Sequence, residues 1–256
     1  MPAPLRPTTA LLTLALLFAG CATTAPPPAQ PTPPPPPPPA AQPAASAPPQ
    51  SEAVHWVRAS AEHRAAFVQT FELAGEKLRE LAEGRQPGTW AVIVDADETL
   101  IDNSLYQAER GGAGFSAESW TAWALRQEAT ALPGAQDFLE TVRSLGGHIA
   151  VVTNRNQAEC LATEDNLAAE RLPYDVVLCM PMGGPSDKGP RWLAVQQGTA
   201  SEALPPLEVL MYLGDSITDF PGGSQQLDAA VLDRFGDVYF MLPNPMYGSW
   251  QRLPPR

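Results

Sequence analysis

Cysteine, histidine and positive charge are all scarce in this chain of 256 residues, and each scarcity excludes a class of protein. There are 3 cysteines and 3 histidines, and the cysteines lack the spacing of zinc ligands. Lysine and arginine together number 16 against 28 aspartates and glutamates, which gives a formal net charge of −12. Because no basic cluster is available to neutralise phosphates along a groove, the composition argues against a nucleic-acid-binding protein.

Long apolar runs are also missing. The N-terminal run from Leu11 to Phe18 is too short for a membrane span, which needs about 20 residues. It follows Arg6 and precedes two small residues and Cys21, so residues 1–20 are predicted to be a signal peptide. The segment LFAGC resembles the lipobox of bacterial lipoproteins, which implies lipidation of Cys21 and a lipid anchor in the bacterial cell envelope. Ala22 then implies the outer membrane, and a secretory signal with an incidental cysteine is the alternative.

Proline, alanine and glutamine dominate the next segment, with an unbroken proline run from Pro33 to Pro39. Such a composition cannot build a core and favours an extended spacer of about 3.1 Å per residue. We therefore expect residues 21–51 to be a disordered tether and residues 52–256 to be one folded domain. Cys160 and Cys179 remain as a pair, and either a disulfide or two buried free thiols fits the sequence.

Strand and helix patterns alternate through the folded part. Apolar residues at helical spacing predict one or two amphipathic helices that end at Gly84. The later alternation predicts an α/β fold, with a Rossmann-like parallel sheet and helices on both faces. A short tryptophan-containing insertion at about 105–132 predicts a small helical cap or flap. The expected strands are 91–94, 148–153, 174–178, 209–213 and 238–242, and the expected helices are 133–145, 157–171 and 188–197.

Two aspartates directly follow the first predicted strand. The run AVIV has no polar alternation, as is typical of a strand buried on both faces of a parallel sheet. Binding sites of such sheets lie beyond the carboxyl ends of the strands, so Asp95 and Asp97 should project into one. Other polar residues follow the second and fourth strands or lie between them, namely Thr153, Asn154, Lys188, Asp215 and Asp219.

Four segments of the chain resemble, in order and spacing, the motifs of the haloacid dehalogenase (HAD) superfamily: DADETLIDNS, VVTNR, SDKGPRW and LGDSITDF. More narrowly, DxDETxxDNSxY and the ending LPNPMYGSW are similar to the class C non-specific acid phosphatases, which include lipoprotein 5′-nucleotidases. Ala96 stands where that pattern has a larger aliphatic residue. The resemblance implies a Mg²⁺-dependent acid phosphatase that hydrolyses phosphomonoesters.

The resemblance also implies a role for each motif residue. Asp95 would attack phosphorus and form an aspartyl-phosphate intermediate. Asp97 would protonate the leaving alcohol and then activate water, which implies an acidic optimum. The further implied roles are phosphate binding by Thr153, Asn154 and Lys188, Mg²⁺ binding by Asp95, Asp97, Asp215 and Asp219, and stacking of a substrate's base on Tyr247.

Several alternatives stay open from the sequence. Nucleoside 5′-monophosphates or NMN are the expected substrates, and a phosphotransferase with an alcohol acceptor is the alternative activity. A non-catalytic, surface-binding lipoprotein is the alternative from another class. The resemblance also implies a homodimer. We expect the flap tryptophans to pack inside the flap, and a platform for the substrate is the alternative.

Overall fold

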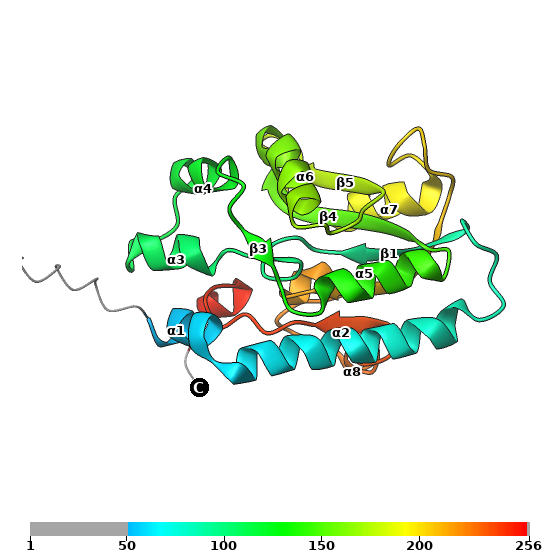
Figure 1. Cartoon of the computed structure of the whole chain (residues 1–256), viewed down its shortest axis with the longest axis horizontal. Coiled ribbons are helices and arrows are strands. Elements are labelled where there is room, and N and C mark those ends of the chain that lie inside the picture. Colours follow the sequence, from blue (N-terminus) through cyan, green and yellow to red (C-terminus); the bar gives the residue numbers. More distant parts are fainter. Residues whose placement is uncertain (1–50, 255–256) are drawn as a thin grey trace, which may run out of the picture. The chain divides into compact units, whose positions relative to one another are not determined.

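The computed structural model describes residues 51–254 (Figure 1). The predicted signal peptide (1–20), the predicted lipidation at Cys21 and all but the last residue of the predicted tether (21–51) lie outside the described residues. Within residues 51–254, no helix is both long enough and apolar enough to cross a membrane.

Five parallel strands form the central sheet, in the order β5-β4-β1-β6-β7. All five residues of β1 are buried, as expected for a central strand that is covered on both faces. Every predicted strand is present, with ends shifted by at most three residues. The strands are β1 (Trp90–Val94), β4 (His148–Asn156), β5 (Val176–Met180), β6 (Glu208–Gly214) and β7 (Tyr239–Met241).

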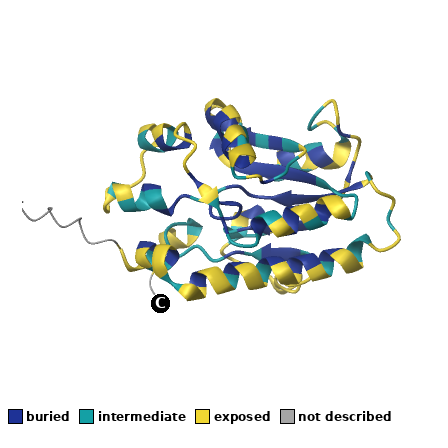
Figure 2. Cartoon of the chain, viewed as in Figure 1, coloured by how far each residue is buried: buried dark blue, intermediate teal, exposed yellow. Residues whose placement is uncertain are grey.

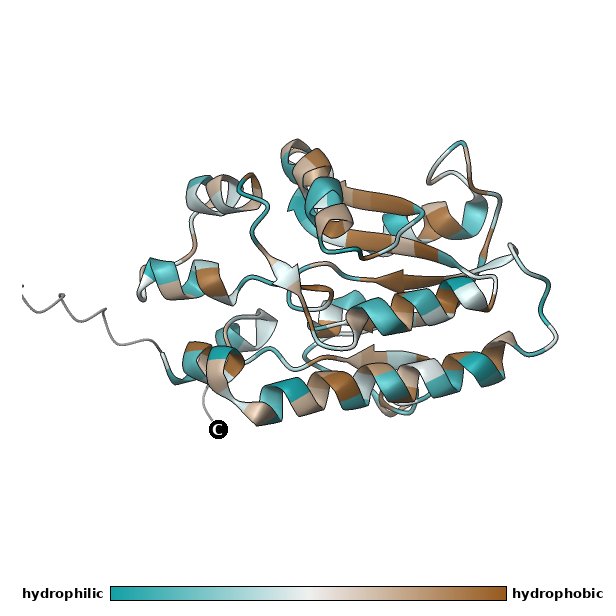
Figure 3. Cartoon of the chain, viewed as in Figure 1, coloured by the Kyte–Doolittle hydropathy of each residue, from teal (hydrophilic) through white to brown (hydrophobic). Residues whose placement is uncertain are grey.

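Helices cover both faces of this sheet, which confirms the predicted α/β architecture (Figure 1). Val92 and Val94 of β1 pack in one core cluster with α2, α5 and α6, whereas Ala91 and Ile93 pack in a second cluster with α7. The centre of the sheet is apolar and buried, and the outer faces of the helices are largely polar and exposed (Figures 2 and 3). The helices are α1 (Glu52–Ala59), α2 (Ala61–Ala82), α5 (Ala135–Ser144), α6 (Cys160–Ala169), α7 (Gly189–Gln197) and the short α8 (Ala229–Leu232).

The predicted flap is a helical insertion that stands beside the main sheet (Figure 1). It contains α3 (Ser104–Arg110) and α4 (Ala117–Ala124) and is carried by the antiparallel strands β2 (Ile101–Asp102) and β3 (Thr130–Ala131). The sequence does not predict this strand pair, because two residues are too few to show a period. The pairing returns the chain to the sheet next to the point where it left.

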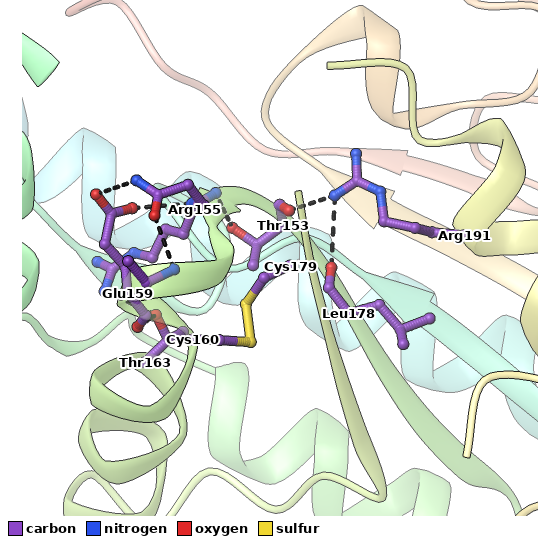
Figure 4. The surroundings of a disulfide bond; sticks show 10 residues. Thr153, Arg155, Glu159, Cys160, Thr163, Leu178, Cys179 and Arg191 are labelled. Carbon is purple, nitrogen blue, oxygen red and sulfur yellow. Dashed lines mark hydrogen bonds between the residues drawn. A yellow bond between two sulfur atoms is a disulfide. The ribbon is translucent and has the colours of Figure 1, made fainter. Parts of the chain in front are cut away.

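A disulfide joins Cys160, the first residue of α6, to Cys179 in β5 (Figure 4). Of the two alternatives that the sequence left open, the structure therefore has the disulfide. The Cα atoms of the two cysteines are 5.8 Å apart. Because β5 is an edge strand, the bond ties the start of α6 to the edge of the sheet.

Removing this disulfide is expected to lower stability. The bond closes a loop with a sequence separation of 19 residues. Closing a loop of that length contributes about 3 kcal/mol in the chain-entropy description. The double substitution Cys160→Ala, Cys179→Ala should then lower Tm by about 6–12 °C in a thermal melt. Wild type in reductant should melt like the double variant, and equal melting of oxidised wild type and the double variant would contradict the expectation.

Candidate active site

The predicted site residues gather at the carboxyl edge of the sheet. Because β1 lies between β4 and β6, Asp95 emerges between the ends of those two strands. Its backbone N–H donates to the carbonyl oxygen of Leu213 in β6 at 3.0 Å. This is the edge of an open α/β sheet at which ligands bind.

Three carboxylates form a compact cluster at this edge. Asp95, Asp215 and Asp219 each offer an oxygen, and these oxygens lie within 4.8 Å of one another. A Cβ at Gly214 would lie 2.4 Å from the Cβ of Asp219, so only glycine permits this close approach. The Asn244 side chain donates to Asp215 at 2.7 Å and fixes its orientation.

Lys188 bridges two of these carboxylates. Its Nζ lies 2.5 Å from Oδ1 of Asp95 and 2.6 Å from Oδ1 of Asp219. Burial alone would lower the pKa of Lys188, but Asp219 and Asp95 outweigh burial, and the pKa is raised above its ordinary value. Lys188 is therefore a permanent positive charge, held directly before the first residue of α7.

The pKa values of two of the carboxyl groups are also raised, which for an aspartate disfavours the charged form. Burial raises the pKa of Asp95 to about 7, an effect that the Lys188 ammonium opposes and that Asp219 reinforces. Burial also raises the pKa of Asp215 well above its ordinary value, and Asp219 and Asp95 add to the rise. Without further positive charge, this site resists full ionisation.

The charge balance fits a divalent cation. Lys188 contacts Asp95 and Asp219, and Arg155 contacts Asp97, so the four predicted aspartates, when all are ionised, have two negative charges in excess of these two cations. Carboxylate oxygens are the ligands that hard divalent cations prefer. Asp95, Asp215 and Asp219 are therefore the residues that could hold such an ion.

Asp97 is held by a separate pair of donors. Its Oδ1 accepts from Nε of Arg155 at 2.9 Å and from Nδ2 of Asn103 at 2.9 Å, and Nη2 of Arg155 lies 2.9 Å from the same oxygen in an ion pair. The Arg155 side chain is fully buried, and the Asp97 side chain is 16% exposed. Neither Arg155 nor Asn103 was predicted to have a role, although they lie inside the motif segments VVTNR and DADETLIDNS.

The strand end at Thr153 and Asn154 differs from the expectation. β4 continues three residues past its predicted end, through Asn156, and the 3₁₀ turn η1 (Gln157–Glu159) then leads into α6, in place of the single helix predicted for 157–171. The Thr153 hydroxyl is buried and accepts from the backbone N–H of Arg155 at 3.1 Å. Arg191 of α7, which sequence analysis missed, donates to the Thr153 carbonyl and, at 2.7 Å, to Oδ1 of Asn154 (Figure 4 shows the first of these bonds).

A cavity of about 940 Å³ opens above the carboxylates, with Asp95, Asp97 and Asp215 among its lining. Its size is that of a small-molecule site. Phe115 of the flap and Tyr247, the predicted aromatic contact, both line it. The two ends of the described chain complete the wall, through Ser51, Val54, Gln251 and Arg252.

Fold and site together define a phosphohydrolase of the HAD superfamily. The chain belongs to subfamily IIIB of this superfamily, the acid phosphatases, whose family model matches residues 40–250. It is similar to the solved structure of the Class C acid phosphatase from Bacillus anthracis, with 31% identity over 78% of this chain and 85% of that chain and a TM-score of 0.67. The same enzyme with tungstate bound matches with 29% identity over the same shares and a TM-score of 0.66. The protein is an acid phosphatase, a phosphomonoesterase of class C.

Proposed function

We propose that this acid phosphatase is Mg²⁺-dependent and works through an aspartyl-phosphate on Asp95. The observation that carries the proposal is the contact of Lys188 with both Asp95 and Asp219, beside Asp215, at the carboxyl edge of the sheet. An ammonium so placed lowers the repulsion between the Asp95 carboxylate and a phosphate dianion.

The metal would be held by the side chains of Asp95 and Asp215 and the backbone carbonyl of Asp97, with Asp219 close by. When bound, Mg²⁺ supplies positive charge against the phosphoryl oxygens. Asn154 is exposed at the end of β4 and lines the cavity, which supports its predicted contact with the phosphoryl group. The Thr153 hydroxyl accepts from the backbone N–H of Arg155, which leaves its own O–H free to donate to a phosphoryl oxygen.

Asp97 is the general acid and base of this proposal. Arg155 and Asn103 both engage Oδ1, so Oδ2 is the oxygen left to carry a proton. As Asp95 attacks phosphorus and the P–O bond breaks, that proton passes to the leaving oxygen. The Asp97 carboxylate then takes a proton from a water molecule, whose oxygen attacks phosphorus and releases Asp95.

Nucleoside 5′-monophosphates and NMN are the substrates that we propose. The cavity has room beyond the carboxylates, and Tyr247 on its wall offers a flat surface for a base. The tungstate bound to a similar Class C acid phosphatase is a tetrahedral oxyanion, which supports an oxyanion subsite here.

Chelation tests the metal requirement. Hydrolysis of nucleoside 5′-monophosphates and p-nitrophenyl phosphate at pH 5 to 7 should fall at least about 100-fold in EDTA and return when excess Mg²⁺ is added, because the clustered carboxylates need a cation. Unchanged turnover in EDTA would overturn the metal dependence.

Transfer of phosphate to an added alcohol in place of water would favour the phosphotransferase. We do not retain the non-catalytic alternative, because the chain belongs to a family of acid phosphatases.

We further propose that the protein is anchored to the bacterial outer membrane through Cys21 and forms a homodimer. The lipobox resemblance and the family resemblance support these two points. Detergent partitioning of wild type against Cys21→Ser tests the anchor, and sizing of the purified protein tests the dimer. Loss of membrane association only in the variant is the expected result.

A further inference from the structure

Asn103 is a buried hub between the flap and the proposed acid. Its Nδ2 donates to Asp97 Oδ1 at 2.9 Å and to Glu98 Oε2 at 3.3 Å, and its Oδ1 accepts from Trp123 Nε1 at 2.7 Å and from Arg155 Nη2 at 3.0 Å. These four bonds use both N–H groups and both lone pairs of the amide. Because the two donors face one side and the two acceptors face the other, only one orientation of the Asn103 amide satisfies them.

The flap helix α4 contacts the two residues that hold Asp97, and at a third place it contacts the turn after β4. Trp123, which is 2% exposed, bonds to Asn103. Thr121 donates to Oε1 of Glu159 at 2.5 Å, and Glu159 is the last residue of η1, directly after β4. The ring of Trp120 lies 5.5 Å from the guanidinium carbon of Arg155. The flap is therefore joined to the residues that hold the acid.

We propose that Trp123 is a positioning residue for Asp97 and acts through Asn103. Its indole N–H fixes the Asn103 oxygen, so that the Asn103 amide and the Arg155 guanidinium together hold Oδ1 of Asp97 and present Oδ2 to the leaving group. This inference rests on the proposed role of Asp97 as the general acid. It makes proton donation depend on a seated flap, because displacement of α4 removes one of the bonds that orient Asn103.

The chemistry of the leaving group supplies a specific readout. The 5′-oxygen of a nucleotide is a poor leaving group and needs the proton of Asp97 as the P–O bond breaks. The oxygen of p-nitrophenyl phosphate leaves readily as the phenolate, so it gains little from that proton. A misplaced Asp97 should therefore slow alkyl phosphates selectively, whereas a general loss of structure should slow both. The value of kcat/KM is the one to compare, because it includes departure of the leaving group and excludes later hydrolysis of the phosphoenzyme.

The test is Trp123→Phe, which removes the indole N–H and keeps an aromatic ring. We expect kcat/KM for a nucleoside 5′-monophosphate to fall about 10-fold, and that for p-nitrophenyl phosphate to fall less than about twofold, since loss of one orienting bond leaves part of the general-acid contribution. Trp192→Phe is the matched control. The buried indole N–H of Trp192 has no hydrogen-bond partner among residues 51–254, so its removal should change neither value.

Asp97→Asn separates the inference from the mechanism beneath it. This variant should show a larger selective loss, about 100-fold or more for the nucleotide, and Trp123→Phe should add no selectivity in its background. If Asp97→Asn slows both substrates equally, the proposed acid role of Asp97 is wrong. If Asp97→Asn is selective but Trp123→Phe slows both substrates equally, or neither, then positioning through Trp123 is overturned.

Discussion

Replacing Asp95 with asparagine is expected to lower kcat/KM for phosphomonoesters by at least about 10⁴-fold, because the amide lacks the charge and the nucleophilic oxygen that attack phosphorus. The side chain is almost the same size, so the buried position should stay filled. A second measurement reports on the covalent step itself. After rapid acid quenching with ³²P-labelled substrate, label should remain attached to wild type and should be missing from Asp95→Asn.

An exposed aspartate provides the matched control for this substitution. Asp233 lies on the surface after α8, and Asp233→Asn makes the same chemical change away from the site. It should keep wild-type kcat/KM and wild-type labelling. Turnover of Asp95→Asn within tenfold of wild type, or labelling of that variant, would show that another group attacks phosphorus.

Lys188→Met is expected to have the second largest effect. Removal of an ammonium that contacts both Asp95 and Asp219 should lower kcat/KM by about 10²- to 10³-fold, as loss of one charge-stabilising donor does in other enzymes. Because two buried carboxylates lose their partner, the free energy of unfolding without added metal should also fall by about 3 kcal/mol. Steady-state kinetics and denaturant titration measure the two effects.

Lys77 makes a matched control for Lys188. Its Nζ also lies near two carboxylates, Glu80 at 3.0 Å and Asp237 at 3.1 Å, but its side chain is 31% exposed. Exposed ion pairs contribute little because solvent screens them, so Lys77→Met should change stability little and activity not at all. Wild-type kcat/KM in Lys188→Met with saturating Mg²⁺ would contradict the role proposed for Lys188.

The sheet could be predicted from the sequence because its strands are uninterrupted apolar runs. The run before Asp95 shows this best, since every residue of β1 is buried. The end of β4 could not be predicted. Its last residues are polar, and the register with β5 shifts between Val152 and Asn156, so the apolar pattern stops before the strand does. The strand was therefore predicted to end at residue 153, three residues before it does.

The charged residues of the site could be predicted from the order of the motifs, and the structure brings Asp95, Lys188, Asp215 and Asp219 together. The polar residues that orient them could not be given roles in this way. Arg155, Arg191 and Asn244 bond to partners 58, 37 and 29 residues away, and Asn103 joins the nearby Asp97 to Arg155, so only the fold shows these pairings. All four lie within quoted motif segments, which was the available signal.

The lining of the cavity by Ser51 and Arg252 bears on how the enzyme can be handled. A fusion partner or immobilisation handle joined close to either end of the domain would sit beside the entrance and crowd large phosphoesters. The loop after α7 is the better place for such a handle. That helix begins beside Lys188, and its nine residues run about 14 Å away from the site.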